Sequence, residues 1–521
     1  STISIHTVEI QSTCEVHQVL EKFSLPSSLE VLCINQNALT FDEVFELVGC
    51  LSNVNNLHEL QLRHTKFKDS SFLTFLGSLH YCKDLTSLIL TDNSLTEQEI
   101  NRLITALLKS VKNLKTLNLS KCILTETQAN AILHNHEQAK NIVSLDLSHN
   151  AIQGNEIVVG ICQLQSLQEL DLSHNCVRFS PLPNFEGKRN HLSTCLKAIS
   201  LSSNHMKPDD ISQFCSLIRS DVSKLILDFN IVGQSIWSLC SLGERIKHLK
   251  VLSLANTDIC DNVDGLALLL SLVRELEDLN LSSNNLMAEN FQQLQTPLSK
   301  LTQLKTLNLS MNAIGPDGMK ALADIFKKFP LLERLDMSSS YIGEDEVSVL
   351  CKSLVSLKKL KSLNLSGNCI DAEVLDDALV LPTTLEELLF SDLIHGEKFF
   401  TQMRRLQNLR KLHLNKLILR QCDVEALAIM LSCFLKLEEL SLANLVAPEC
   451  GTILISIKWL KNIRKIDLTG MKLSNGEALV NMLSSCHFLE ELVLDRMSGT
   501  NIHYERLFCA IKLLKRLRKL C

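Results

Sequence analysis

One spacing of apolar residues returns along almost the whole chain and limits what it can fold into. The clearest copy covers residues 304–314, LKTLNLSMNAI, and follows the pattern L-x-x-L-x-L-x-x-N-x-L. On a strand, Leu307 and Leu309 point to one face and the residues between them to the other. Asn312 follows where the strand turns away, and its amide can bond free backbone groups of its own and neighbouring turns. One unit cannot bury its apolar edge alone, so the copies must stack.

Copies of this unit follow one another at steps of 24 to 29 residues. They start at Leu29, Leu57, Leu85, Leu114, Ile142, Leu167, Leu196, Val222, Leu249, Leu276, Leu304, Leu332, Leu360, Leu385, Leu409, Leu437, Ile463 and Leu489. A return path of this length can hold a full helix. Residues 315–330 show one, with Pro316 near its start, apolar residues at helical spacing and Pro330 beyond its end. We therefore expect an α/β solenoid, a right-handed horseshoe with parallel strands on its concave face and helices on its convex face.

The residue at the position of Asn312 changes along the chain. It is Asn in nine repeats: Asn37, Asn93, Asn150, Asn175, Asn204, Asn230, Asn284, Asn312 and Asn368. It is Thr, Cys or Ser in four others: Thr65, Cys122, Thr257 and Ser340. It is apolar in the last five: Leu393, Leu417, Leu445, Met471 and Met497. An apolar side chain cannot cap backbone groups, so these last turns must be shaped differently or satisfied in another way.

These changes predict three segments within one solenoid. Residues 1–28 form a degenerate first repeat, residues 29–384 form regular repeats with an Asn ladder, and residues 385–521 form a segment of different curvature. The last copy of the unit stops in mid-strand at Cys521, without a polar capping repeat. Because solenoids normally need such caps, we expect the chain to be part of a longer protein.

Composition excludes several classes of function. The formal net charge is −6 and the pI is about 6.3, which argues against nucleic acid as the main partner. No apolar run is long enough for a membrane span. The nineteen cysteines are scattered, without metal-ligand spacing, and several fall on core positions. We interpret them as reduced core residues, which predicts a cytoplasmic protein.

The chain carries no nucleotide-binding or hydrolase motif, so we expect neither catalysis nor a cofactor. His149 and His174 occupy equivalent positions in successive DLSHN turns, and Asp146 and Asp171 line up likewise on the outward strand face. Two His and two Asp side chains could form a metal or acid–base site. Repetition of one consensus explains them better, and we treat them as candidates for contact with a partner.

Three Phe residues are further candidates for contact with a partner. Residues 178–195 contain two prolines and a glycine, which predict an irregular loop that includes Phe179 and Phe185. Such a loop can carry binding function, although a tolerated surface insertion is the simpler explanation. Phe229 takes an outward position that is mostly polar in other repeats, whereas Phe390 takes an inward position and is expected in the core.

Charged pairs alternate in sign over the last six repeats. They are Glu386-Glu387, Arg410-Lys411, Glu438-Glu439, Arg464-Lys465, Glu490-Glu491 and Arg518-Lys519. Neighbouring strands should therefore place opposite charges side by side, which predicts a role in strand register. The alternative is a mixed-charge surface that receives a partner, with Arg410 and Lys411 as contact residues.

The 26–29-residue period, the LxxLxLxxN/CxL strands and the helical returns resemble the ribonuclease-inhibitor-like class of leucine-rich repeats over residues 29–521. Within that class, a long array that contains cysteines and lacks caps is similar to the C-terminal region of a NOD-like receptor, the nucleotide-binding and leucine-rich-repeat family of innate immunity. The resemblance implies a non-catalytic recognition and autoinhibition domain whose partner is a protein ligand or the receptor's own nucleotide-binding domain. The alternative is a free-standing scaffold or inhibitor like ribonuclease inhibitor, or a GTPase activator.

Overall fold

The computed structural model describes residues 6–10, 28–35, 38–54, 56–67, 71–111, 113–133, 140–181, 183, 189–368, 370, 381–394, 396–473, 476–499 and 504–521. Asn37, Phe185 and most of the predicted first repeat lie outside this part of the chain. The chain divides into two compact units, Ser1–Thr257 (unit 1) and Asp258–Cys521 (unit 2). No helix among the described residues has the length and apolar character needed to cross a membrane.

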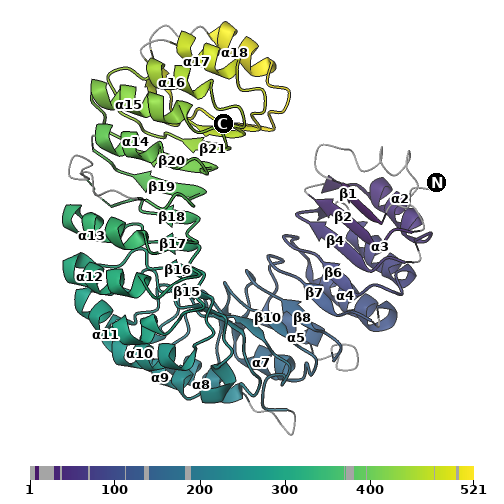
Figure 1. Cartoon of the computed structure of the whole chain (residues 1–521). Coiled ribbons are helices and arrows are strands. Elements are labelled where there is room, and N and C mark those ends of the chain that lie inside the picture. The colour runs from purple at the N-terminus through teal and green to yellow at the C-terminus, as the bar shows by residue number, and fades with distance from the viewer. Residues whose placement is uncertain are drawn as a thin grey trace. The chain divides into compact units, whose positions relative to one another are not determined.

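Unit 1 is a parallel sheet with helices along one of its faces (Figure 1). Its strands are β1 (Thr7–Ile10), β2 (Val31–Asn35), β3 (Ala38–Leu39), β4 (Glu59–Arg63), β5 (Lys66–Phe67), β6 (Ser87–Ile89), β7 (Thr116–Asn118), β8 (Ser144–Asp146), β9 (Gln153–Gly154), β10 (Glu169–Asp171), β11 (Cys176–Val177), β12 (Ala198–Ser200), β13 (Lys224–Ile226) and β14 (Val251–Ser253). Its helices are α2 (Phe41–Leu51), α3 (Ser71–Ser78), η1 (Leu79–Tyr81), α4 (Glu97–Ser110), α5 (Glu126–Leu133), α7 (Glu156–Cys162), α8 (Pro208–Leu217), η2 (Gly233–Ser235), α9 (Ile236–Cys240) and η3 (Gly243–Ile246). The main sheet runs β1-β2-β4-β6-β7-β8-β10-β12-β13-β14, and every neighbouring pair is parallel.

Unit 2 repeats this layering of a parallel sheet with helices along one face. Its strands are β15 (Asp278–Asn280), β16 (Thr306–Asn308), β17 (Arg334–Asp336), β18 (Ser362–Asn364), β19 (Glu387–Ser391), β20 (Lys411–Asn415), β21 (Glu439–Ser441), β22 (Lys465–Asp467), β23 (Lys472–Leu473), β24 (Glu491–Val493), β25 (Ser498–Gly499) and β26 (Lys519–Leu520). Its helices are η4 (Cys260–Asn262), α10 (Val263–Leu272), α11 (Ala288–Ser299), α12 (Gly315–Phe326), α13 (Glu344–Leu354), α14 (Glu397–Met403), α15 (Gln421–Ser432), α16 (Gly451–Ile457), α17 (Glu477–Leu483) and α18 (Tyr504–Lys512). Its main sheet is also parallel and runs in chain order from β15 to β26, without β23 and β25.

The core lies between the sheet and the helices, as the apolar spacing predicts. Leu307 and Leu309 of the β16 repeat are fully buried, and so are Met319 and Leu322 of α12, which face them across this layer. Phe390, which we expected in the core, is 1% exposed. The predicted α/β architecture of parallel strands and helical returns is confirmed.

The predicted Asn ladder is present as hydrogen bonds between successive turns. Asn312 donates from Nδ2 to the carbonyl of Leu309 in its own turn (2.9 Å) and to that of Leu281 in the preceding repeat (3.0 Å). Its Oδ1 accepts from the backbone N–H groups of Asn284 (3.1 Å) and Leu286 (3.0 Å). Nδ2 also donates to the carbonyl of Ser310 (3.2 Å), so one buried amide satisfies five backbone groups, which would cost free energy if left unpaired.

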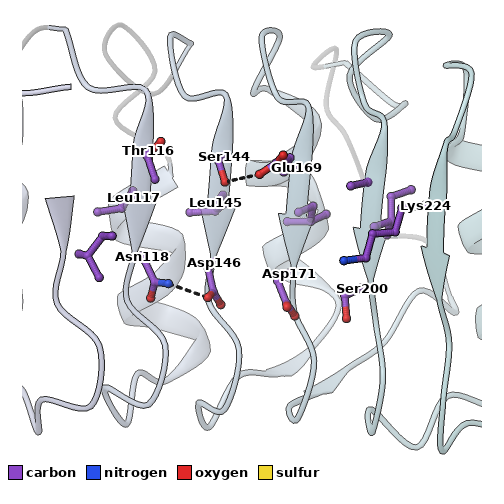
Figure 2. A pocket seen from close by; sticks show the side chains of 14 residues that line it. Thr116, Leu117, Asn118, Ser144, Leu145, Asp146, Glu169, Asp171, Ser200 and Lys224 are labelled. Carbon is purple, nitrogen blue, oxygen red and sulfur yellow. Dashed lines mark hydrogen bonds between the residues drawn. The ribbon is translucent and has the colours of Figure 1, made fainter. Parts of the chain in front are cut away.

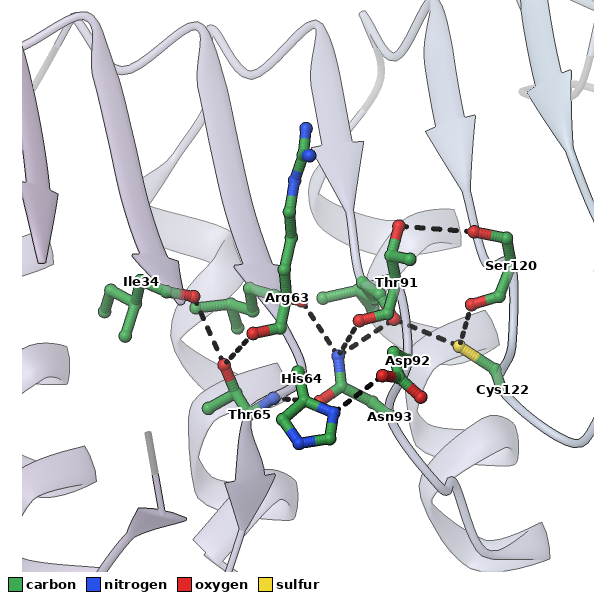
Figure 3. Close-up of polar contacts among 11 residues, drawn as sticks. Ile34, Arg63, His64, Thr65, Thr91, Asp92, Asn93, Ser120 and Cys122 are labelled. Atoms are coloured by element: carbon green, nitrogen blue, oxygen red, sulfur yellow. Dashed lines mark hydrogen bonds and ion pairs between the residues drawn. The ribbon is translucent and has the colours of Figure 1, made fainter. Parts of the chain in front are cut away.

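Smaller polar residues supply part of this ladder where Asn is missing (Figure 3). Thr65 donates from Oγ1 to the carbonyl of Ile34 at 3.2 Å, and Cys122 donates from Sγ to that of Leu90 at 3.0 Å. Asn93, between them, also donates to the carbonyl of Leu90 at 2.8 Å. The ladder thus continues through the Thr and Cys repeats.

The apolar ladder positions are satisfied by backbone groups. Leu393 and Leu417 are fully buried. The N–H of Ile418 donates to the carbonyl of Leu393 (3.1 Å), and the N–H of Val446 donates to that of Leu417 (2.8 Å). Backbone hydrogen bonds thus join these turns, although they involve other groups than those that the Asn312 side chain bonds. The sheet continues through the predicted boundary at residue 385, since β18 pairs with β19. The three-segment division and its change of curvature stay a prediction.

The described residues of the return between β11 and β12 contain no helix, as predicted, whereas residues 182 and 184–188 of the predicted loop lie outside the described part of the chain. Asp210 of α8, which is 3% exposed, anchors the loop. Its carboxylate accepts from the backbone N–H groups of Phe179 (2.8 Å) and Ser180 (2.9 Å) and from the guanidinium of Arg178 (3.2 Å). The start of this loop is therefore fixed by a residue from the following repeat.

Candidate functional site

The face of unit 1 opposite its helices carries a hollow of about 320 Å³ over β7 to β13. We call it the acidic hollow, because Asp146, Glu169 and Asp171 line it together with one basic residue, Lys224. Figure 2 shows that the Lys224 side chain reaches from β13 across β12 toward these carboxylates. Three carboxylates against one ammonium group leave an excess of negative charge on this surface.

The two aspartates of the hollow lie side by side. Asp146 of β8 and Asp171 of β10 are direct partners in the sheet register, which confirms the predicted alignment. Each accepts a hydrogen bond from the backbone N–H two residues ahead, at 2.9 Å from Ser148 and at 2.8 Å from Ser173. Asn118 also donates to Asp146 at 2.7 Å. These bonds orient the carboxylates, because the backbone just after each strand supplies two of the donors.

The third carboxylate of the hollow was not singled out from the sequence. Glu169 accepts a hydrogen bond from Oγ of Ser144 at 3.0 Å, which joins β10 to β8 (Figure 2). Lys224 was missed as well. Both residues stand at the third position of the repeat, where residue types vary freely, so only their shared place over the sheet distinguishes them.

A row of residues in the left-handed backbone conformation follows the strands along one rim of the hollow. His149, His174, Ser203 and Phe229 have φ values of 55°, 54°, 54° and 57°. Each donates its backbone N–H at 2.8 Å to a carbonyl of the next repeat, so the four side chains stand in register. Phe229 is 54% exposed, which agrees with its predicted outward position. The hollow and this rim therefore bring five of the predicted partner-binding residues to one surface.

The two histidines of the rim stack on each other, with ring centroids 3.9 Å apart and planes 11° apart. Partial burial and the neighbouring His174 lower the pKa of His149 below its ordinary value, so its neutral form is favoured. Among the described residues, no three His, Cys, Asp or Glu side chains are grouped as metal ligands. The stacked pair thus offers a flat aromatic surface beside the carboxylates.

A related polar pair stands earlier in the same row. His64 and Asp92, whose φ values are 51° and 61°, form a hydrogen bond of 2.6 Å between Nδ1 and Oδ2 (Figure 3). These residues occupy the equivalent position in successive repeats, one period of 28 residues apart, so the periodicity was the signal that could have found them. The rim therefore links successive repeats through side chains as well as through backbone.

The repeated strand, the ladder hydrogen bonds and the helical return decide the architecture. The chain is a leucine-rich-repeat solenoid. The Leucine Rich repeat family model matches residues 163–178, 300–323 and 356–373. Leucine-rich-repeat folds generally serve as non-enzymatic recognition scaffolds that present an extended binding surface.

Two solved structures are similar to this solenoid. A leucine-rich-repeat protein of Leptospira interrogans has 20% sequence identity and a TM-score of 0.36, over 98% of this chain and 100% of that chain. The TLR13–ssRNA13 complex has 17% identity and a TM-score of 0.45, over 96% of this chain and 64% of that chain. No curated protein matches the sequence.

Phe179 does not lie on the surface of the solenoid. Its ring is 2% exposed and packs edge-on against Phe214 of α8, with centroids 5.3 Å apart. The prediction that Phe179 contacts a partner therefore needs correction, because the hydrogen bonds to Asp210 turn this end of the loop inward. Phe185 lies outside the described residues.

Arg410 and Lys411 belong to a separate surface in unit 2. Arg410 forms an ion pair of 3.0 Å with Glu438, and Lys411 is the register partner of both Glu387 and Glu439. The predicted side-by-side placement of opposite charges is confirmed. Their contact with a partner stays a prediction.

Proposed function

We propose that this solenoid is the non-catalytic recognition and autoinhibition region of a cytoplasmic NOD-like receptor. In this role it binds a protein ligand or the receptor's own nucleotide-binding domain through the acidic hollow and its rim. The partner presents basic side chains to Asp146, Glu169 and Asp171, and an apolar group to Phe229. Positive potential on the partner would complement the excess negative charge of the hollow.

One observation carries this proposal: the hollow contains fixed acceptors rather than a reactive group. Asp146 and Asp171 already accept backbone hydrogen bonds, and these bonds hold the two carboxylates in place on the surface of the sheet. A surface whose charges are held in place loses little side-chain entropy when a partner binds. The exposed Phe229 adds an aromatic group of the kind that often anchors protein interfaces.

The cysteines support a reducing compartment such as the cytoplasm. All seventeen described cysteines are free thiols. Burial raises the pKa of five of them to about 12, as expected of thiols that act as small core residues: Cys122, Cys162, Cys215, Cys351 and Cys486. Such isolated buried thiols are typical of proteins that remain reduced.

Affinity capture from cytosolic lysate, with bound proteins identified by mass spectrometry, tests the proposal. The test variant combines Asp146→Asn, Asp171→Asn and Phe229→Ala. A matched control, Asp317→Asn with Asp324→Asn, removes two exposed carboxylates from α12. We expect a nucleotide-binding module or a protein ligand that binds wild type and control, and binds the test variant at least tenfold more weakly when reconstituted from purified components.

Two outcomes would contradict the proposal. If all three baits retain the same partners equally, the acidic hollow is not the recognition surface. If the hollow-dependent partner is a ribonuclease or a small GTPase, the chain acts as a free-standing inhibitor or activator instead.

A further inference from the structure

Unit 2 carries a second hollow, of about 590 Å³, at the sheet edge where β18 to β21 begin. We call it the basic hollow. Five basic side chains line it, together with two carboxylates, Glu333 and Glu386. The basic residues are Lys358, Lys359, Lys361, Arg410 and Lys436. Its excess charge is therefore positive, opposite in sign to that of the acidic hollow in unit 1.

Two of the basic residues belong to a ladder of alternating charge. The residue at the second repeat position alternates in sign over ten consecutive strands: Glu277, Lys305, Glu333, Lys361, Glu386, Arg410, Glu438, Arg464, Glu490 and Arg518. Lys361 pairs with Glu333 at 3.1 Å, and Arg410 pairs with Glu438 at 3.0 Å. The lysine also holds the pKa of Glu333 below its ordinary value. The ladder charges thus compensate one another along the sheet.

The excess charge comes from three lysines outside the ladder. Lys358 and Lys359 directly precede the β18 unit, and Lys436 directly precedes the β21 unit; all three are exposed. Lys436 donates to Oδ1 of Asn408 at 2.8 Å, which is an uncharged acceptor. The two repeats between those of Lys359 and Lys436 have uncharged residues, Thr384 and Asn408, at the same position. The positive excess is therefore local to this edge and is not a property of every repeat.

The arrangement of charges favours one kind of anion. Lys361 and Arg410 lie two strands apart, which is about 10 Å at the usual strand spacing. Glu386 of the strand between them stands in the same row. A compact polyanion such as a phosphate chain would meet this carboxylate at close range, whereas carboxylates spaced along a polypeptide can lie on either side of it.

We propose that the basic hollow of unit 2 binds an acidic segment of a partner polypeptide, with carboxylates set about 10 Å apart. The segment crosses the starts of β18 to β21, and its carboxylates meet Lys361, Arg410 and the three lysines outside the ladder. This site is independent of the acidic hollow and of the function proposed above. It gives the solenoid a second docking surface, selective for partners of the opposite charge.

Fluorescence anisotropy with a labelled (Gly-Gly-Glu)4 peptide tests the proposal at low ionic strength, because a chain in the polyproline II conformation places every third residue on one side, about 9 Å apart. The test variant is Lys358→Ser, Lys359→Ser and Lys436→Ser. The control, Lys320→Ser, Lys327→Ser and Lys328→Ser, removes the same charge from exposed residues in and just after α12. We expect the test variant to bind at least tenfold more weakly than wild type and the control to bind within twofold of it. Variant Asp146→Asn with Asp171→Asn should bind like wild type, which separates this site from the acidic hollow.

Three results would overturn the proposal. The first is no binding of the peptide to the wild-type chain, and the second is equal binding by the test variant. The third is displacement of the peptide by tripolyphosphate or by single-stranded DNA at a lower charge concentration than by unlabelled peptide. That result would assign the hollow to compact polyanions instead.

Discussion

At the scale of single residues, the ladder position of the repeat is occupied in two ways: by Asn, whose side chain bonds backbone groups, or by an apolar residue, whose side chain cannot. The Asn312 side chain bonds five backbone groups, and its neighbours in the ladder do much the same. Leu417 bonds none with its side chain, yet the backbone around it is paired, since its carbonyl accepts from the N–H of Val446 at 2.8 Å. We therefore expect that Asn and Leu cannot replace each other at this position without a loss of stability, because the turns around them differ in backbone hydrogen bonding.

Restoring the consensus amide at an apolar position should therefore destabilise the fold. In Leu417→Asn, we expect the buried amide to lack partners in this differently shaped turn, which costs about 1–3 kcal/mol. The lost leucine burial adds about 2 kcal/mol. We expect a loss of about 3–5 kcal/mol, measured as faster hydrogen exchange in β20 and β21. Leu417→Met, which keeps the volume, should cost less than about 1.5 kcal/mol. Unchanged exchange in the Asn variant would show that free backbone groups remain in this turn.

The residue scale also shows what the sequence could predict and what it could not. The Asn ladder and the buried Phe390 follow from a periodic pattern, so one copy explains all of them. The burial of Phe179 depends on Asp210, which lies 31 residues away and follows no pattern. Likewise, the apolar residue at Leu393 is visible in the sequence, but the hydrogen bond from the N–H of Ile418 to the carbonyl of Leu393 is not. Contacts that break the period need the three-dimensional structure.

At the scale of elements, the charge ladder of unit 2 connects neighbouring strands. Lys465 lies between Glu439 and Glu491, at 3.3 Å and 3.8 Å. His413 donates from Nε2 to a carboxylate oxygen of Glu439 at 2.8 Å. Sequence periodicity predicted the alternation, since each charged pair recurs at one repeat position. Periodicity could not predict the basic hollow, because the hollow depends on lysines that precede the strand in only two of the repeats.

Charge reversal tests the register role of this ladder. In Arg410→Glu with Lys411→Glu, like charges would face Glu386 and Glu387 on one side and Glu438 and Glu439 on the other. Each lateral pair is worth about 0.2–1 kcal/mol, with exposed pairs at the low end, so we expect a loss of about 1–3 kcal/mol. Thermal melting and hydrogen exchange of β19 to β21 measure it.

The neutral variant Arg410→Gln with Lys411→Gln serves as the control for this reversal. It removes attraction without adding repulsion, so its loss should be smaller. High salt should reduce the difference between the two variants, because it screens exposed charges. If the reversed variant melts and exchanges like wild type, the alternation has no role in register.

At the scale of the whole molecule, stability is a sum of neighbour contacts. Leu307 of β16 is in register only with Leu279 and Leu335, and all three are at most 2% exposed. A cavity at Leu307 therefore weakens two interfaces of the stack directly, and more distant repeats feel it only through them. The two hollows lie in different units, so damage near one should spare the other.

Leu307→Ala tests this locality. Removal of a fully buried leucine should cost about 2–5 kcal/mol, and the loss should appear as faster hydrogen exchange in β15 to β17. Exchange in β7 to β10 of unit 1 should stay as in wild type, and so should binding at the acidic hollow. Leu307→Met, which keeps the volume, controls for the substitution itself. If protection falls equally in both units, the chain opens as one cooperative body, and the nearest-neighbour description of its stability is wrong.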